Sequence, residues 1–377
     1  MPTIKGSSAP VAGRRKFLKT AGVTGAAAVA TIAMPQVSRA QTQVWKYQST
    51  WPSKDIFHEF AVDYANVVNS LSGGRLKLDV LAAGAVVPAF QMADAVHAGV
   101  LDAGHGVSGY WYGKHKAYSL FGTPPSFGWD AASFLGWFYN GGGEALYKEL
   151  VNNILKLNLT GYLYFPMPTQ PLGWFKKEVK SGDDFKGLKY RTIGLSAEMF
   201  KEMGAAVTIM AGGDIVPGLD RGLLDAAEFN NPSSDIILGF PDVAKFYMLG
   251  SHHQQMEAFE VIFNKAKVDA LPKELQDMLR YASHASSSEQ ICKAYDRYSK
   301  DLEEIKKRGV NVVKTSQPVL DAQITAWQKV IAEQSKEPFF AKVIESQKAW
   351  NKRVFAYTSV NNLDSQALAA GHKTLIG

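Results

Sequence analysis

The sequence predicts an α/β protein of two lobes with a cleft between them, a long helix that spans both lobes, and further helices at the C-terminal end. Strand and helix patterns alternate along the first part of the chain, which is the order that builds α/β sheets. The 337 residues that follow a leader of forty exceed what one hydrophobic core usually holds. From Pro272 onward, long charged helical patterns replace the alternation.

The first forty residues have the three parts of an export signal. Arg14 and Arg15 form a twin-arginine pair, an apolar run covers 20–33, and the small residues Ser38 and Ala40 match a signal-peptidase site. The apolar run has 14 residues, whereas a membrane span needs about 20. We therefore predict a twin-arginine signal peptide at 1–40, cleavage after Ala40 and a periplasmic location, and we disfavour a membrane anchor.

Charge and cysteine content exclude two further classes of protein. The chain has 41 Lys and Arg against 35 Asp and Glu, but six of the basic residues and none of the acidic ones lie in the first forty. The remainder has zero net charge and no polybasic stripe, so we expect no nucleic-acid partner. Cys292 is the only cysteine, which excludes an internal disulfide, and its surroundings predict a place on a helix.

The first lobe is predicted to cover residues 41–165, with later segments completing it. We expect strands where apolar and polar residues alternate or a short apolar run occurs, and helices where apolar residues recur every three or four positions. The strands are placed at 44–48, 76–81, 103–107 and 160–165, and the helices at 55–71, 88–99 and, broken near Gly141, 131–158. Gly73 and Gly74 stop the first helix, and Pro166 interrupts the last strand.

The second lobe is predicted to cover residues 166–255. Its strands are placed at 172–175, 187–191, 207–210 and 226–229, its helices at 196–203 and 215–223, and further apolar segments at 235–238 and 246–249. The remaining residues, 256–377, are predicted to hold the end of a return strand (252–263), a long connecting helix at 272–307, and helices at 321–335 and 338–356.

One arginine and one glutamate are the strongest candidates for a binding site in the second lobe. Arg191 ends an apolar strand pattern, Gly212 and Gly213 are expected in a turn, and Glu228 follows two alanines that are expected to be buried. An arginine can hold a carboxylate with two hydrogen bonds, and a buried carboxylate must be paired, metal-bound or protonated. Together they predict a pocket for a small organic acid. The alternatives are a surface ion pair for Arg191, and a structural ion pair or a substrate contact for Glu228.

Several motifs resemble those of the solute-binding proteins of tripartite ATP-independent periplasmic (TRAP) transporters, the DctP family. The motifs are LAAGAVVP at 81–88, SGYWYGK at 108–114, QPLGWF at 170–175, FKGLKYR at 185–191 and GGDIVPGLDRGLLDAAE at 212–228. The likeness covers roughly 44–356 and is closest to the branch that binds 2-oxo acids and lactate. It implies the two-lobed fold of periplasmic binding proteins.

The resemblance also implies roles for named positions. Its substrate-binding positions correspond to Arg191, Gln170, Phe229, Tyr110 and Trp111. Its metal-binding positions correspond to Glu228, Gln170, Gln254 and the backbone carbonyl of Phe229. Phe229 stands where the branch often has tryptophan, and the segments 216–218 and 250–253 also depart from it, so the pocket wall differs from that of the branch.

The implied metal set offers only oxygen donors, which suit a hard cation rather than zinc. With one carboxylate and two neutral amides its charge is low, so we expect Na⁺ or weakly bound Ca²⁺, bound with the substrate. Each glutamine alone has a plain alternative, a hydrogen bond to a loop. His252 and His253 are a weak candidate for a zinc site, because neighbouring residues on a strand point to opposite faces.

We therefore expect a receptor and not an enzyme. It would bind a small 2-oxo or 2-hydroxy monocarboxylate with a metal ion and deliver it to TRAP membrane subunits. The resemblance also implies a homodimer formed through a swapped C-terminal helix at 338–356. Three alternatives stay open: the same receptor fold binding a dicarboxylate or larger acid without metal, an exported enzyme that acts on organic acids, and a partner of a signalling receptor. No His, Cys or Lys can be assigned from the sequence as an acid–base group near Arg191, which weakens the enzyme alternative.

Overall fold

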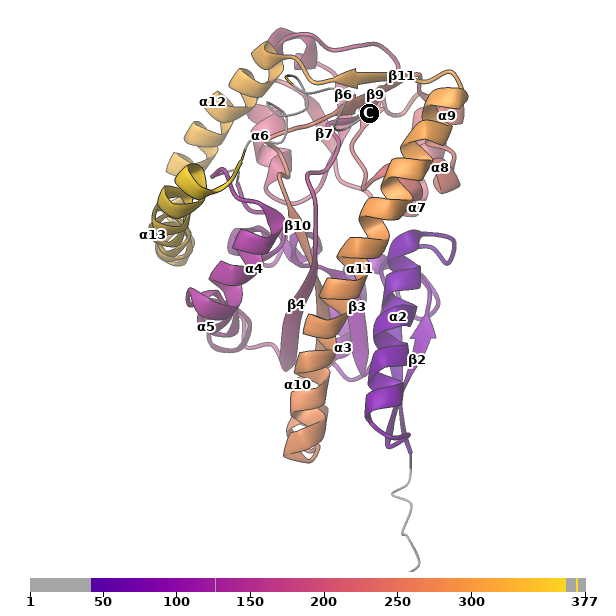
Figure 1. The fold of residues 1–377 in the computed structure, drawn as a ribbon, viewed down its shortest axis with the longest axis vertical. Helices are drawn as coiled ribbons and strands as arrows, with labels where there is room; N and C mark the ends of the chain where they lie inside the picture. The colour runs from indigo at the N-terminus through magenta and orange to yellow at the C-terminus, as the bar shows by residue number, and fades with distance from the viewer. Residues whose placement is uncertain (1–41, 126, 364–370, 372–377) are drawn as a thin grey trace, which may run out of the picture. The chain divides into compact units, whose positions relative to one another are not determined.

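The computed structural model describes residues 42–125, 127–363 and 371. The predicted signal peptide at 1–40 and its cleavage site lie outside the described residues. The compact unit Thr42–Gly377 has two β-sheets with helices around them (Figure 1).

The first sheet has five strands in the order β2-β1-β3-β10-β4. The strands are β1 (Gln43–Ser49), β2 (Leu76–Leu81), β3 (Ala103–Val107), β4 (Leu159–Met167) and β10 (Glu257–Asn264). β1 is parallel to β2 and β3, whereas β10 is antiparallel to β3 and β4. The helical segments between these strands are α2 (Ile56–Leu71), η1 (Ala89–Gln91), α3 (Met92–His97), η2 (Ser108–Trp111), η3 (Lys116–Phe121), α4 (Ala131–Asn140), α5 (Gly143–Lys148) and the π-helical η4 (Glu149–Ile154).

The second sheet has six strands in the order β11-β9-β5-β8-β6-β7. The strands are β5 (Gly173–Phe175), β6 (Lys189–Arg191), β7 (Ala206–Thr208), β8 (Ala226–Ala227), β9 (Phe246–Leu249) and β11 (Asn311–Lys314). β6 is parallel to both β7 and β8, so these three strands end at the same edge of the sheet. The helical segments of this part are η5 (Gly182–Phe185), α6 (Ser196–Glu202), α7 (Gly212–Asp220), α8 (Pro232–Leu238) and α9 (Phe240–Val243).

A long helix joins the two sheet regions. After the short α10 (Lys265–Asp269), α11 (Lys273–Lys307) runs for 35 residues and packs against α2 and β4 on one side of the fold and against α8 on the other. Figure 1 shows it passing β4 and α2 on its way to α8 and α9. Near the C-terminal end, α12 (Gln317–Gln334) packs on α6, and α13 (Pro338–Asn361) packs on η3 and α4. The predicted fold class, with its spanning helix and C-terminal helices, is confirmed.

Helix α2 illustrates how the sequence fixes one element of the first lobe. The Asp55 side chain caps its first turn and accepts a 2.9 Å hydrogen bond from the Phe57 amide, which short polar residues do at helix starts. Its buried residues recur at the spacing of a single helix face: Ile56, Phe57, Phe60, Ala61, Tyr64, Ala65 and Val68. Phe57 meets Phe259 of β10 edge-on, with ring centroids 4.4 Å apart. The apolar stripe therefore binds the helix to the sheet.

Strand β4 continues where a break was expected. It runs through Pro166 to Met167, because β4 lies at the edge of its sheet and a missing N–H there costs no ladder hydrogen bond. The pairing register with β10 shifts beside this point, and Phe165 takes a positive φ of 39°. The Phe165 amide donates to the Ser287 hydroxyl of α11 at 2.8 Å, so the bulge is tied to the long helix.

One other local prediction was wrong, and one strand was missed. Gly212 and Gly213 are not a turn but the first residues of α7, which begins three positions earlier than expected. β11 was not predicted, because its four partly exposed residues carry too short a pattern to separate from a loop.

Candidate carboxylate-binding site

The site begins where two parallel strands of the second sheet end together. Arg191 is the last residue of β6 and pairs in register with Ala227 of β8. Glu228 follows β8, and its amide donates to the Arg191 carbonyl at 3.1 Å. Residues 37 positions apart in sequence thus become neighbours. The carboxyl ends of parallel strands are the usual place for ligands in open α/β sheets.

Arg191 is buried, and four of its five guanidinium N–H groups donate to the protein. Nε and Nη2 donate to the Met210 carbonyl at 3.0 and 2.9 Å, and Nη1 donates to the Glu228 carbonyl at 3.1 Å and to Glu228 Oε1 at 2.9 Å. Only 1% of the residue is exposed. The surface ion pair that the sequence left open is therefore excluded. A two-pronged grip on an acid would require Nη1 to release Glu228 Oε1.

Glu228 is a buried carboxylate with two partners. Arg191 contacts one oxygen, and the side-chain amide of Gln170 donates to the other. Burial raises the pKa of Glu228, and the nearby Arg191 guanidinium opposes that rise. Burial therefore favours the neutral carboxyl group, the ion pair favours the charged one, and the metal-binding role of Glu228 stays a prediction.

Gln170 and Gln254 meet where β4 and β10 leave the first sheet. The backbone N–H of Gln170 donates to the backbone carbonyl of Gln254 at 3.0 Å. This bond continues the pairing of β4 and β10 beyond the ends of the two strands. Both side chains are buried. Among the described residues, neither Oε1 of Gln170 nor either polar atom of Gln254 has a hydrogen-bond partner. Buried amide oxygens without a partner are costly unless a ligand satisfies them, so they fit a bound cation or acid.

Phe229 forms the wall behind the arginine. Its ring lies 5.7 Å from the Arg191 guanidinium and stacks on Phe240 with centroids 5.6 Å apart. A β-carbon on Gly212 would lie 2.6 Å from this ring, so the glycine is needed for α7 to approach it. The role of the Phe229 carbonyl toward a metal stays a prediction.

Tyr110 and Trp111 are neighbours in η2 but face different surroundings. The Tyr110 hydroxyl lies in the electrostatic field of Arg191 and Glu228, and burial raises its pKa. The Trp111 indole instead donates to Glu260 of β10, inside the first lobe. The structure therefore places the Tyr110 hydroxyl within electrostatic range of Arg191 and Glu228 and ties the Trp111 indole to Glu260, and the substrate-binding roles of both residues stay predictions.

Sequence reasoning missed one buried acid near this group. Glu257 is the first residue of β10, 2% exposed, and lies within electrostatic range of both Glu228 and Arg191. The signal was present in the sequence, because Glu257 and Glu260 interrupt an otherwise apolar strand pattern. Acids in such a run are rarely buried without a partner or a function.

The two histidines do not form a zinc site. His253 is buried, its Nδ1 lies 2.6 Å from the Ser251 hydroxyl, and burial lowers its pKa to about 3. His252 is only half-buried. Within the described part of the chain, no three His, Cys, Asp or Glu side chains gather as a metal cluster. A cation at this site would need the amide and carbonyl oxygens as well.

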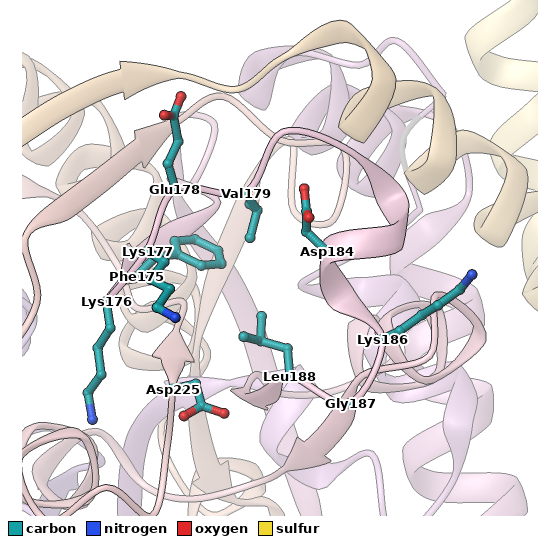
Figure 2. Close-up of a pocket in the computed structure, with 10 residues that line it drawn as sticks. All are labelled: Phe175, Lys176, Lys177, Glu178, Val179, Asp184, Lys186, Gly187, Leu188 and Asp225. Atoms are coloured by element: carbon teal, nitrogen blue, oxygen red, sulfur yellow. The ribbon is translucent and has the colours of Figure 1, made fainter.

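A surface pocket of about 470 Å³ lies at the opposite end of the same strands (Figure 2). Its lining includes Leu188, just before β6, and Asp225, just before β8, whereas Arg191 and Glu228 follow the strands' far ends. Lys176 and Lys177 stand at its rim, and Phe175 and Val179 supply apolar surface. This pocket is separate from the carboxylate-binding site.

The comparison with known families decides the identity of the chain. The family model described as bacterial extracellular solute-binding protein, family 7 (DctP), matches residues 47–337. The chain belongs to this family. A relative from Nostoc sp. (strain PCC 7120), a monocarboxylate 2-oxoacid-binding periplasmic protein, is 32% identical over 368 residues, which is 95% of this chain and 99% of the relative. The predicted resemblance is confirmed.

Solved structures agree with this assignment. A TRAP solute-binding protein from Bordetella bronchiseptica, a dimer with calcium and picolinate in one site, has a TM-score of 0.83 and 27% identity, covering 89% of this chain and 98% of that one. Another from Pseudoalteromonas atlantica, with sodium and pyruvate, has a TM-score of 0.80 and 28% identity, covering 88% and 99%. No helix within residues 42–125 and 127–363 of this DctP protein is both long and apolar enough to cross a membrane.

Proposed function

We propose that this DctP protein is the receptor of a TRAP transporter for a small 2-oxo or 2-hydroxy monocarboxylate, which it binds together with Na⁺ or Ca²⁺. The buried Arg191–Glu228 pair beside the unpartnered amide oxygens of Gln170 and Gln254 carries this proposal. The relatives from Nostoc and Pseudoalteromonas, which bind 2-oxoacids and pyruvate by name, support the substrate class.

Each side chain has a distinct task in the proposal. Arg191 holds the acid's carboxylate, and Nη1 changes partner from Glu228 to the acid to do so. Glu228, Gln170, Gln254 and the Phe229 carbonyl would hold the cation, which supplies positive charge for the acid's remaining oxygens. Tyr110 is brought from the first lobe toward the same charges and closes over the acid. Trp111 acts indirectly, because it fixes η2 through Glu260.

The site binds and does not catalyse in this proposal. His253 lies in the electrostatic field of Arg191, but with a pKa of about 3 it stays neutral and so cannot act as a general acid near neutral pH. Release of unchanged ligand to TRAP membrane subunits is then the expected outcome. Turnover of pyruvate by the pure protein would favour the enzyme alternative.

The location and the chain's organisation belong to the same proposal. The family is extracellular by its description, which supports export. We infer export by the twin-arginine route with cleavage after Ala40, and lobes at 41–165 and 166–255 that are joined by the segment 256–377. The dimeric relative from Bordetella supports a homodimer, with 338–356 as the exchanged helix.

Melting temperature measured against a ligand panel tests the proposal. The mature protein, before and after cation stripping, is heated with 2-oxo acids, 2-hydroxy acids and dicarboxylates. A ligand at 100 times its Kd stabilises the folded state by about 2.7 kcal/mol, which raises Tm by several degrees. We expect such rises only with monocarboxylates and only with cation present. Rises with dicarboxylates, or rises that survive stripping, would favour the metal-free alternative.

A further inference from the structure

A buried hydrogen bond joins the two sheet regions close to the carboxylate-binding site. The Leu195 amide, which follows β6 of the second sheet, donates to the Ser119 hydroxyl at 3.0 Å. Ser119 lies in η3, which packs on η2, the segment that follows β3 of the first sheet. Both residues are fully buried. Leu195 is the N-cap residue of α6, so no carbonyl of that helix accepts its N–H, and the other sheet region supplies the acceptor.

Gly194 packs against the same hydroxyl and leaves no room for a side chain. Its φ is 58°, in the left-handed region that glycine favours. A β-carbon on Gly194 would lie 2.8 Å from Ser119 Oγ and 3.3 Å from Thr123 Oγ1. Ile193 crosses at the same place, since a β-carbon on Gly109 of η2 would lie 3.7 Å from Ile193 Cδ1. The two sheet regions therefore meet at van der Waals distance, and we name this meeting of 193–195 with 109–123 the closure contact.

The closure contact is continuous with the acid-binding arginine. Arg191 ends β6, and the chain reaches Leu195 four residues later. In this arrangement the site is sealed, because Arg191 and Gln170 are each 1% exposed and Glu228 is fully buried. An acid can reach these groups only when the two regions move apart, as lobes do about a hinge. The bond between Ser119 and Leu195 joins opposite sides of that opening, so it breaks on opening and forms again on closing.

A second pair of contacts between the same elements is more exposed. The Tyr112 hydroxyl donates to Glu198 of α6, and Lys116 Nζ lies 3.9 Å from the same carboxylate. The Lys116 side chain is 44% exposed and that of Glu198 26%, and an ion pair so open to water contributes little. The buried bond of Ser119 is therefore the stronger candidate for holding the regions together.

We propose that Ser119 and Gly194 are positioning residues for acid binding, which hold the two lobes closed over Arg191. The proposal rests on the proposed function for its ligand, whereas the contact itself belongs to the fold. Neither residue needs to touch the acid. An acid that is held in the closed arrangement binds with an apparent Kd that rises when this arrangement is less populated. Loss of the closure contact therefore weakens binding from outside the site.

Ser119→Ala, Gly194→Ala and the double variant test the proposal, with pyruvate affinity measured by calorimetry in calcium. Ser119→Ala removes one acceptor and should weaken binding about two- to tenfold. Gly194→Ala should weaken it on the order of tenfold or more, because its β-carbon and Ser119 Oγ cannot both fit in the closed arrangement. Ser119→Ala removes the atom that this β-carbon meets, so the loss in the double variant should be smaller than the product of the two single losses.

Two variants are matched controls. Gly187 has a φ of 73°, and no atom lies within 4 Å of a β-carbon placed on it, so Gly187→Ala adds the same backbone strain without a clash. Ser72 Oγ accepts the Leu76 amide at 3.2 Å within the first sheet region, so Ser72→Ala removes a similar bond that closure does not make or break. Both controls should bind pyruvate as the unmodified protein does, even where their unfolding free energy falls.

Normal affinity in both Ser119→Ala and Gly194→Ala would overturn the positioning role. So would losses that simply multiply in the double variant, or an equal loss in Gly187→Ala. Failure of the unmodified protein to bind pyruvate would instead count against the proposed function. The radius of gyration of the ligand-free proteins, from small-angle X-ray scattering, then decides the role of the contact: a larger radius in Gly194→Ala than in Gly187→Ala supports it, and equal radii overturn it.

Discussion

Two glutamates on strand β10, three residues apart, are treated by the fold in opposite ways. Glu260 accepts hydrogen bonds from the Trp111 indole and, at 2.8 Å, from the Tyr147 hydroxyl. Glu257 is also buried, at 2% exposure, and no side-chain hydrogen bond to it is found among the described residues. Burial raises the pKa of Glu260 to about 7 and that of Glu257 to about 8. The protein therefore supplies two hydrogen-bond donors to Glu260, whereas no donor to the Glu257 carboxylate is found among the described residues.

The amides show the same contrast. Gln323 of α12 exchanges hydrogen bonds with the Ser251 hydroxyl and accepts one from the His252 amide at 2.8 Å. Gln254, two residues further along the chain than His252, has neither side-chain atom satisfied among the described residues. Burial alone therefore does not mark a functional polar group. A buried amide without a partner costs about 1–3 kcal/mol in lost hydrogen bonding, so Gln254 has more to gain from a bound ligand than Gln323 has.

The largest effect is expected when the charge balance around Glu228 is broken. Arg191→Met removes the guanidinium that pairs with this buried carboxylate at 2.9 Å, so unfolding free energy should fall by about 3–5 kcal/mol and acid binding should be lost. The double variant Arg191→Met/Glu228→Gln removes both charges and should regain part of that stability without regaining binding. Urea unfolding and calorimetry measure the two effects. Acid affinity close to normal in either variant would refute the anchor role of Arg191.

Glu228→Gln alone should weaken cation-dependent acid binding by about 2–5 kcal/mol, as loss of one buried charged partner does. Gln170 contacts the same carboxylate, so Gln170→Ala should act in the same direction and the two effects should not add. Calorimetric titration with pyruvate in calcium and after stripping provides the measurement. If Glu228→Gln binds pyruvate normally and ignores cation removal, the pocket holds no metal.

The pH dependence of the unfolding free energy should reveal the titration of Glu260, the glutamate that accepts hydrogen bonds from Trp111 and Tyr147. Folding raises the pKa of Glu260 to about 7 from its ordinary value near 4.5, so the folded state binds this proton more tightly. Its contribution to stability is full below about pH 4.5 and is lost as pH rises to about 7, a change of up to about 3 kcal/mol.

Glu260→Gln should therefore flatten the decline in unfolding free energy between these pH values, measured by urea unfolding at fixed salt. Asp55 and Asp235, whose pKa values burial raises to about 6 and about 7, give declines of the same sign that the variant keeps. An unchanged slope in Glu260→Gln would show that this carboxylate stays ionised in the folded protein.

The smallest effect is expected at Trp111. Trp111→Phe removes one hydrogen bond to Glu260 and should lower unfolding free energy by about 1–3 kcal/mol, since a buried acceptor loses a partner. Acid affinity should change much less than in Tyr110→Phe, because only Tyr110 lies near Arg191. Thermal unfolding and titration of both variants make the comparison. A larger affinity loss at Trp111 than at Tyr110 would restore Trp111 as a ligand contact.

Sequence reasoning found most elements because their periodicity was strong. Helix α2, strand β2 and the long α11 follow patterns that local burial dictates, and the predicted ranges lie within one residue of the observed ones. Arg191 and Glu228 were found from motif spacing. Glu257 was missed, because a lone acid in an apolar run does not say which groups the folded chain brings to it. Sequence adjacency also could not show that the Trp111 indole donates to the buried Glu260 of β10, while its predicted contact with a substrate stays a prediction.

The anchoring of Arg191 has a kinetic consequence. Its Nε and Nη2 are fixed on the Met210 carbonyl before any acid arrives, so the rotamer entropy of the side chain, about 0.5–1.5 kcal/mol, is already lost in folding and is not lost again on association. An incoming acid therefore meets a side chain that is already in place, and the one exchange left is that of Nη1 from Glu228 to the acid. Encounter should then be fast and nearly alike for acids of similar charge, and discrimination among them should lie in how long each one stays bound.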